Sequence, residues 1–394
     1  MRPFEGIKVI DLTHVLAGPF AAYQLAVLGA DVIKIENPED CDQSRNTGSD
    51  AALNRSNMGS SYLAQGSNKR AITLNLKTEK ARAILKQLVA DADVLIENYR
   101  AGAFEALGLG YKDLQAVNPQ LIYCSMTAFG QGGPRRTHTA YDHAIQATSG
   151  IMAMTGEKDA APIKCGAPII DYSTGTMAAF AIASALFQRT RTGRGQHIDC
   201  AMADVAMMLE ASHIAGYSST GKVPHPHGNK HAYASSYFYD TKDGGVMLAA
   251  SNRRQNKRLF DAVGHPELGD RDNETRAKKF NEEAALLQEV MRNKSAQEWE
   301  DHLQARHVPA LKMRSMDEAL ADPQVKTRKI LHTLESIPGV TGPLTVPLCA
   351  FRLEHGEASI ETPPPRLGEH NAEVLATLGY GADDVAALKN EGVI

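Results

Sequence analysis

Short apolar runs alternate with longer amphipathic stretches through the first two hundred residues of the chain. Residues 7–12 and 31–35 are apolar runs typical of buried strands, and residues 19–28 have the spacing of a helix that ends before Gly29. The same order returns with strands predicted at 72–76 and 94–96 around a helix at 78–90. Strands that alternate with helices form a parallel sheet covered on both faces. The pattern therefore predicts an α/β fold with a doubly wound, mostly parallel sheet.

Further along, four polar side chains are predicted to follow strand ends. Another strand is predicted at 121–125, and the apolar run 167–170 is predicted to be a strand that leads through Asp171 into a helix. Ligands of doubly wound sheets bind at the carboxyl ends of the strands. His14, Asn98, Ser125 and Asp171 are therefore expected along one rim of the sheet.

The pattern changes near residue 221 and again near residue 326. Residues 221–250 are rich in His, Gly, Tyr and Ser, and helices follow with capping-box patterns at Ser295-x-x-Glu298 and Ser315-x-x-Glu318. The last segment contains a proline-rich bend at 363–365 and a helix predicted at 371–378. We therefore expect a large α/β domain over 1–220, a smaller α+β domain over 221–325, and a C-terminal segment over 326–394.

Composition is that of a soluble enzyme long enough for two domains. The chain has 394 residues, of which 43% are hydrophobic and 22% are charged. A net charge of −4 predicts no general affinity for nucleic acid or for an anionic membrane. The five cysteines form no C-x-x-C pair and indicate reduced thiols, and no signal peptide is visible. No apolar run is expected to span a membrane, so the predicted location is cytoplasmic.

Several common sites are disfavoured by missing motifs. There is no G-x-G-x-x-G after the first strand, no P-loop motif and no G-x-S-x-G, which disfavours nicotinamide cofactors, P-loop nucleotides and an α/β-hydrolase. His225, His227 and His231 lack helical spacing and a Cys or Glu partner, so no metal site is expected.

Asp171 is the strongest candidate for chemistry, although it has an ordinary alternative. At the start of a helix, free backbone N–H groups and the helix dipole would favour its charged form, and a carboxylate in a cleft can attack an acyl group. The alternative is a structural N-cap, a role that Asp commonly has.

Cations around two strands offer contacts for a nucleotide. Lys69, Arg70 and Lys77 surround one strand in an arrangement suited to a phosphate, while Tyr99 and Arg100 follow another strand with a planar ring and a guanidinium. A solvated basic edge would explain the same residues without any ligand.

Taken together, these segments resemble the class III CoA-transferases of the CaiB/BaiF type. That family includes formyl-CoA transferase and succinyl-CoA-dependent dicarboxylate CoA-transferases. The resemblance covers nearly the whole chain and includes Asp171 with its helix. It is carried by residues 6–19, 28–36, 68–70, 97–99, 130–134, 141–142, 192–196, 243–244 and 363–370.

The resemblance implies a Rossmann-like large domain completed by the C-terminal segment, an inserted small domain, and an interlocked homodimer. It implies that Asp171 is the nucleophile, that the substrates are an acyl-CoA and a carboxylic acid, and that no metal or redox cofactor takes part. By position, the implied contacts to CoA and its thioester are His14, Ala17, Leu74, Asn75, Lys77, Asn98, Tyr99 and Arg100, and Tyr141 and Asp142 border the pocket. The implied reaction proceeds through an aspartyl anhydride and an aspartyl-CoA thioester.

Departures from formyl-CoA transferase affect the expected substrates. Leu16 replaces a Gln of that enzyme, while Asn37 and Ala106 replace two arginines. Formyl-CoA and oxalate are therefore disfavoured, and residues 124–127 and 213–215 are closer to the succinyl-CoA-dependent enzymes. In the small domain, Asn229, Lys230, His231 and Arg253 could meet a second carboxylate of the acceptor.

Two other functions remain open from the sequence. An α-methylacyl-CoA racemase needs a His and an Asp on either side of an acidic carbon, whereas this chain has Tyr141 before Asp142 and its histidine only at His143. A non-catalytic CoA-binding subunit would keep the basic contacts without needing Asp171 as a nucleophile.

Overall fold

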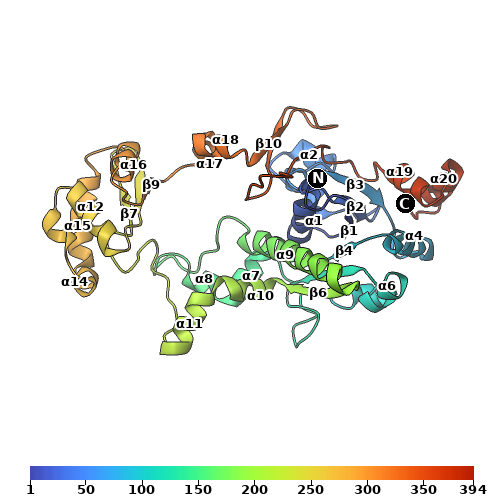
Figure 1. Cartoon of the computed structure of the whole chain (residues 1–394), viewed down its shortest axis with the longest axis horizontal. Helices are drawn as coiled ribbons and strands as arrows, with labels where there is room; N and C mark the ends of the chain where they lie inside the picture. Colours follow the sequence, from blue (N-terminus) through green and yellow to red (C-terminus); the bar gives the residue numbers. More distant parts are fainter. The chain divides into compact units, whose positions relative to one another are not determined.

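The computed structural model describes all 394 residues, which group into two compact units by their contacts. The first unit comprises Met1–Ile151, Cys165–Gly221 and Arg328–Ile394, and the second comprises Met152–Lys164 and Lys222–Thr327. Both ends of the chain belong to the first unit (Figure 1). Residues 152–164, which the sequence analysis placed in the large domain, group with the second unit.

The first unit is built on a six-stranded, fully parallel sheet. Its strand order is β3 (Lys69–Thr73), β2 (Asp31–Glu36), β1 (Lys8–Leu12), β4 (Val94–Glu97), β5 (Ile122–Thr127) and β6 (Gln196–Ala201). This is the 3-2-1-4-5-6 order of doubly wound folds, with the direction of winding reversed between β1 and β4. The predicted α/β architecture is thereby confirmed.

Helices cover both faces of this sheet. On one face, α1 (Ala17–Val27) and α9 (Ile169–Thr192) bury Ala22, Ala178 and Ile182 against Val9 and Ile96. On the other face lie α4 (Glu79–Ala90), α6 (Tyr111–Val117), α19 (Asn371–Thr377) and α20 (Ala382–Asn390). Because α19 and α20 pack on the same core as the first strands, the C-terminal segment completes the sheet domain.

The shorter elements of the first unit surround this framework. They are η1 (Gln43–Asn46), α2 (Ala51–Arg55), α3 (Ser60–Leu63), α5 (Ala103–Ala106), α7 (Asp142–Ser149), α10 (Met202–Leu209), α11 (Ala211–Thr220) and the hairpin of β10 (Leu331–Leu334) and β11 (Leu344–Pro347).

Helix α9 differs from its prediction in two ways. The strand predicted at 167–170 does not form, because Pro168 is the N-cap and Ile169 already begins the helix. Asp171 therefore lies in the first helical turn rather than after a strand, and Ser125 lies inside β5 rather than beyond it. Helix α9 is also long and apolar enough to cross a membrane by length and composition, contrary to expectation, although it packs along α1 and the sheet (Figure 1).

The second unit has a three-stranded antiparallel sheet and a set of helices with a core of their own. The sheet order is β7 (Phe238–Asp240), β8 (Gly245–Leu248) and β9 (Ala310–Lys312). The helices are α12 (Arg253–Ala262), α13 (Pro266–Gly269), α14 (Asn273–Lys278), α15 (Phe280–Met291), α16 (Ala296–Gln304) and α17 (Met316–Ala321), while α8 (Ile151–Met154) and α18 (Pro323–Arg328) lie at the boundaries with the first unit. The capping boxes predicted at Ser295 and Ser315 are confirmed at the starts of α16 and α17.

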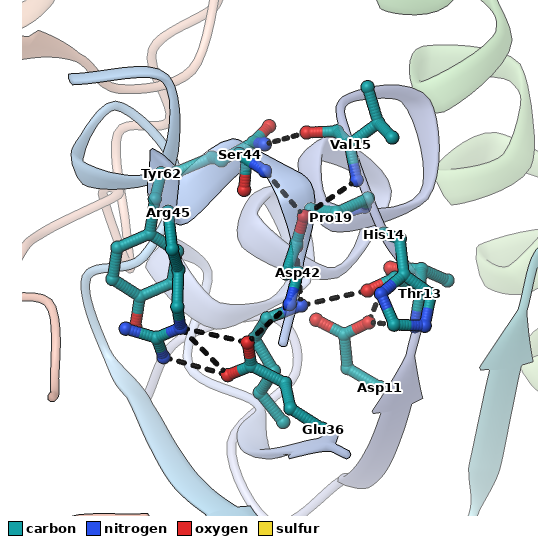
Figure 2. A network of polar contacts seen from close by, with 12 residues as sticks. Asp11, Thr13, His14, Val15, Pro19, Glu36, Asp42, Ser44, Arg45 and Tyr62 are labelled. Carbon is teal, nitrogen blue, oxygen red and sulfur yellow. Dashed lines mark hydrogen bonds and ion pairs between the residues drawn. The ribbon is translucent and has the colours of Figure 1, made fainter. Parts of the chain in front are cut away.

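A network of buried charges joins β1, β2, the first residue of β3 and the segment around η1 (Figure 2). Its three ion pairs are Lys69–Asp11 at 2.9 Å, Lys34–Asp42 at 2.9 Å and Arg45–Glu36 at 2.7 Å, and every side chain involved is at most 1% exposed. These pairs are linked into one network, because Lys34 also donates to the Thr13 carbonyl and the Asp42 N–H donates to Glu36. Three cations balance three carboxylates, so no buried charge is left uncompensated.

Removing one member of this network is expected to cost far more stability than removing a surface charge. Arg45→Met would leave Glu36 buried without its partner, and the expected loss in the free energy of unfolding is about 3–5 kcal/mol. Urea denaturation followed by circular dichroism measures this loss. The control is Lys80→Met, which breaks the exposed pair with Glu391 and is expected to cost less than about 1 kcal/mol. Equal losses in the two variants would contradict the structural importance of the buried network.

Candidate functional site

A cavity of about 380 Å³ opens at the carboxyl edge of the sheet, beyond the ends of the neighbouring strands β1 and β4. Doubly wound sheets bind their ligands at this position, because the loops after the two strands turn to opposite faces. The cavity is lined by His14, Val15, Leu16, Ala17, Asn98, Tyr99, Arg100, Ala101, Met126, Thr127, Ala128, Arg136, His138, Thr139, Ala140, Tyr141, Asp171, Thr174 and Met202.

The loops after β1 and β4 hold each other in place. The His14 N–H donates to Asn98 Oδ1 at 2.9 Å, and Asn98 Nδ2 donates back to the His14 carbonyl at 2.8 Å. His14 Nε2 lies 3.0 Å from the Tyr99 hydroxyl. Burial lowers the pKa of His14, and the nearby Lys34 charge acts in the same direction, so the imidazole is neutral near pH 7. A neutral imidazole at this position can orient a polar group without adding charge.

Close packing of α9 on α1 brings Asp171 to the cavity. A Cβ atom on Gly175 would lie 2.6 Å from the Ala17 carbonyl oxygen, so only glycine allows the two helices to approach this closely. Tyr172 packs edge-on against Phe20 of α1 at 4.8 Å between ring centroids. Asp171 and Thr174 both line the cavity, since residues three apart share one face of a helix.

Asp142, rather than Asp171, caps the start of α9. Oδ2 of the buried Asp142 accepts the N–H groups of Ile170 and Asp171 at 2.8 and 3.1 Å, while Gln146 donates to its other oxygen. The free N–H groups at this helix terminus are therefore satisfied by a carboxylate from α7. The N-cap interpretation of Asp171 is wrong, and the Asp171 carboxylate remains available to the cavity.

The protonation of Asp171 also differs from expectation. Burial, together with the nearby Asp142 charge, raises the pKa of Asp171 to about 7. From the sequence, the helix terminus was expected to favour the charged form of Asp171. That expectation is wrong, because Asp142 already occupies the terminal N–H groups and adds a like charge beside Asp171.

The cations predicted to bind a phosphate fall into two groups: some are held in ion pairs, and others are free. Lys69 is buried in its ion pair with Asp11, and Arg70 pairs with Asp31 and Glu373, so neither is free to hold a phosphate as the sequence suggested. Arg100 does line the cavity.

Two ionisable side chains of the cavity wall were not among the site residues predicted from the sequence. Arg136 and His138 line the cavity and are exposed to solvent. Both come shortly after the glycine-rich turn at 130–134. That turn was the feature of the sequence that could have indicated a loop at the site.

Apart from Tyr141, the remaining candidates lie outside the cavity wall. Leu74 is buried in the core, the Asn75 N–H donates to the Val393 carbonyl, and Lys77 is exposed after β3. Asp142 lies behind Asp171, whereas Tyr141 lines the cavity and is 53% exposed.

The residues singled out in the second unit lie at the surface. Asn229, Lys230, His231 and Arg253 are exposed. No group of three His, Cys, Asp or Glu side chains positioned to hold a metal ion is found, so His225, His227 and His231 do not form a cluster.

Sequence comparisons match one family over nearly the whole chain. The family model described as CoA-transferase family III matches residues 4–371. The succinate–glutarate CoA-transferase of Agrobacterium fabrum is 38% identical over 95% of this chain and 96% of its own length. The human succinyl-CoA:glutarate CoA-transferase is 34% identical over 100% of this chain and 90% of its own length.

Solved structures agree with the sequence comparisons. A CaiB/BaiF family protein from Brucella suis is 35% identical and has a TM-score of 0.83. The match covers 96% of this chain and 99% of that protein.

The proximity of Asp142 predicts a measurable effect on the ionisation of Asp171. Asp142→Asn removes the like charge but keeps an oxygen for the N–H groups of Ile170 and Asp171. The pKa of Asp171 is therefore expected to fall from about 7 while staying above its usual value of 3.8, because burial remains. Carbon NMR titration of labelled aspartate, with Asp171→Asn to assign the signal, measures the shift. An unchanged or higher pKa in Asp142→Asn would refute the assigned cause.

Proposed function

The chain belongs to CoA-transferase family III, and on that premise we propose that it transfers CoA from succinyl-CoA to a dicarboxylic acid through Asp171. The observation that carries the proposal is the carboxylate of Asp171, which does not cap a helix and lines a cavity where the direction of winding of the sheet reverses. The two relatives described above carry names that pair succinate or succinyl-CoA with glutarate, which supports this donor and acceptor class.

Asp171 would act as a nucleophile in its ionised form. An oxygen of Asp171 attacks the acyl carbonyl carbon, the carbon–sulfur bond breaks, and CoA leaves as a thiolate with a mixed anhydride formed on the enzyme. The thiolate then attacks the aspartyl carbonyl, which releases the donor acid as a carboxylate and leaves an aspartyl-CoA thioester. Each step exchanges one acyl bond for another, so no net proton transfer is needed.

The second half of the reaction runs through the same intermediates in reverse. The acceptor carboxylate attacks the aspartyl thioester and expels the CoA thiolate, giving a second mixed anhydride. The thiolate attacks the acceptor carbonyl, forms the new acyl-CoA and frees Asp171. A pKa near 7 makes Asp171 a better nucleophile than an ordinary aspartate, while a substantial fraction stays ionised at neutral pH.

The cavity wall offers groups for the anionic ends of both substrates. Arg100 and Arg136 supply guanidinium groups suited to phosphate or carboxylate oxygens. His14 and Ala17 also line the cavity, and we assign them to the surroundings of the reacting thioester. We assign CoA itself as a substrate of the reaction and propose no metal or redox cofactor.

We further propose that the chain works as an interlocked homodimer in the cytoplasm. Large apolar side chains are exposed on three consecutive helices of the first unit, and a second copy would cover them. They are Phe180 and Phe187 on α9, Met207, Met208 and Leu209 on α10, and Ile214 and Tyr217 on α11. The five cysteines are all free thiols, which is consistent with a reducing compartment.

The alternative functions have less support in the cavity. The racemase reading relied on His143, which is exposed, stacks on Tyr141 and does not line the cavity. A non-catalytic CoA-binding subunit would not need a carboxylate such as Asp171, which has a raised pKa and no capping role, beside the proposed CoA contacts.

Asp171 is expected to carry the covalent intermediate. Incubation with succinyl-CoA followed by borohydride should modify Asp171, as read by mass spectrometry of the peptide that contains it. Asp171→Ala should lose transfer to glutarate by at least about a thousandfold, because no other carboxylate can replace the nucleophile. The matched control is Asp204→Ala on α10, which should retain transfer. Transfer that survives Asp171→Ala in a folded protein would sink the proposed mechanism.

The oligomeric state tests the second proposal. Light scattering after gel filtration should give about twice the chain mass of 42.6 kDa. Phe180→Lys combined with Phe187→Lys should lower the fraction of dimer, whereas Phe351→Lys, an exposed phenylalanine outside α9–α11, should not. If the chain is a monomer at all concentrations, the homodimer is refuted. Cosedimentation of the wild-type chain with lipid vesicles through α9 would also contradict the proposal that a second copy covers this surface.

A further inference from the structure

Val15, in the cavity wall, has a backbone conformation that branched side chains rarely adopt. Its φ is +72°, in the left-handed region where a Cβ with two substituents meets the backbone. The other non-glycine residues with positive φ are Asn57, Asn68, His307 and Lys329, none of which is β-branched. Strain of this kind persists only where the surrounding structure imposes it.

Two buried side chains impose the conformation by binding both ends of the residue. Oδ1 of Asp42 accepts the Val15 N–H at 2.9 Å, and Nε2 of Gln65 donates to the Val15 carbonyl at 2.8 Å. Asp42 is 0% exposed and Gln65 is 2% exposed, and neither lines the cavity. They therefore act on the turn from behind, without access to a bound substrate.

Asp42 is itself held rigidly by the buried charge network (Figure 2). It pairs with Lys34, it accepts the Ser44 N–H at 2.9 Å, and its own N–H donates to Glu36. Burial alone would raise the pKa of Asp42, but Lys34 and the Val15 N–H outweigh it and hold the pKa well below its usual range. The acceptor for Val15 is thus a fixed anion at any pH near neutrality.

The strained turn determines what the cavity presents on either side of Val15. Before it comes His14, tied to the loop after β4 by Asn98, and after it come Leu16 and Ala17, where α1 begins. If Val15 returned to a negative φ, the chain between His14 and Ala17 would change direction. The start of α1 would then shift relative to Asp171.

We propose that Gln65 and Asp42 are positioning residues for the transfer reaction, because they hold Val15 in the left-handed turn that places His14 and Ala17 around the thioester. The inference rests on the proposed function, since an acyl-CoA in this cavity is what the turn would position. It assigns a reaction role to two side chains that do not touch the substrate.

The test removes the Gln65 hydrogen bond in three backgrounds. Gln65→Met keeps the side-chain length, and it also removes Oε1, which has no hydrogen-bond partner, so the protein should remain folded. The backgrounds are wild type, Val15→Ala and Val15→Gly. Val15→Ala removes both methyl groups of the side chain, as Val15→Gly does, but it keeps the Cβ that makes positive φ unfavourable.

Gln65→Met is expected to lower kcat about tenfold in the wild-type and Val15→Ala backgrounds, each relative to its own parent. In the Val15→Gly background the loss should be less than about threefold, because glycine adopts positive φ without help. The KM for succinyl-CoA should change less than kcat in every case, and thermal midpoints should verify folding. Equal losses in all three backgrounds would show a merely structural role, and no loss in the wild-type background would also overturn the inference.

A second measurement follows the turn without relying on activity. Hydrogen exchange of the peptide covering residues 14–18 should be faster in Gln65→Met than in the wild-type chain, and Gln65→Leu should repeat the effect. Unchanged exchange in both variants would overturn the inference. If the wild-type chain shows no transfer activity at all, the proposed function fails, while this exchange measurement still decides whether Gln65 holds the turn.

Discussion

The electrically balanced network of buried charges that joins β1, β2 and β3 is the constraint on which the candidate site depends. Three cations and three carboxylates are removed from water together, so each is stable only while its partner stays in place. Because its members come from β1, β2, β3 and the segment around η1, the network fixes the ends of the strands relative to one another. The loop at His14 and Val15 is then built on a rigid base.

Two carboxylates near the start of α9 have different tasks because their surroundings differ. Asp142 accepts backbone N–H groups and satisfies the helix terminus, whereas Asp171 receives no such donors and is buried beside a like charge. This division leaves the Asp171 carboxylate free of a capping role. The raised pKa of Asp171 would favour the nucleophilic attack that we propose for it.

Family III membership and the structure support each other at this site. The 3-2-1-4-5-6 order places the loops after β1 and β4 at one crevice, and the loop at 136–141 and helix α9 close it with Arg136, Tyr141 and Asp171. Transfer of CoA needs a nucleophile, a place for the thioester and cationic groups for anionic ends. The first unit supplies the residues that we propose for all three, and the strained turn at Val15 lies in the same cavity wall.

Local patterns in the sequence determined the parallel strands, the helix at α1 and the capping boxes of α16 and α17, because apolar spacing and cap chemistry act over a few residues. The sequence also identified Asp171, His14, Asn98 and Tyr99, which the fold brings to one cavity. Only the tertiary structure decided that residues 169–170 are helical, that Lys69 and Arg70 are occupied in ion pairs, and that Asp142 caps the helix of Asp171. Each of these outcomes depends on a partner distant in the sequence, and a local pattern does not contain the partner's position.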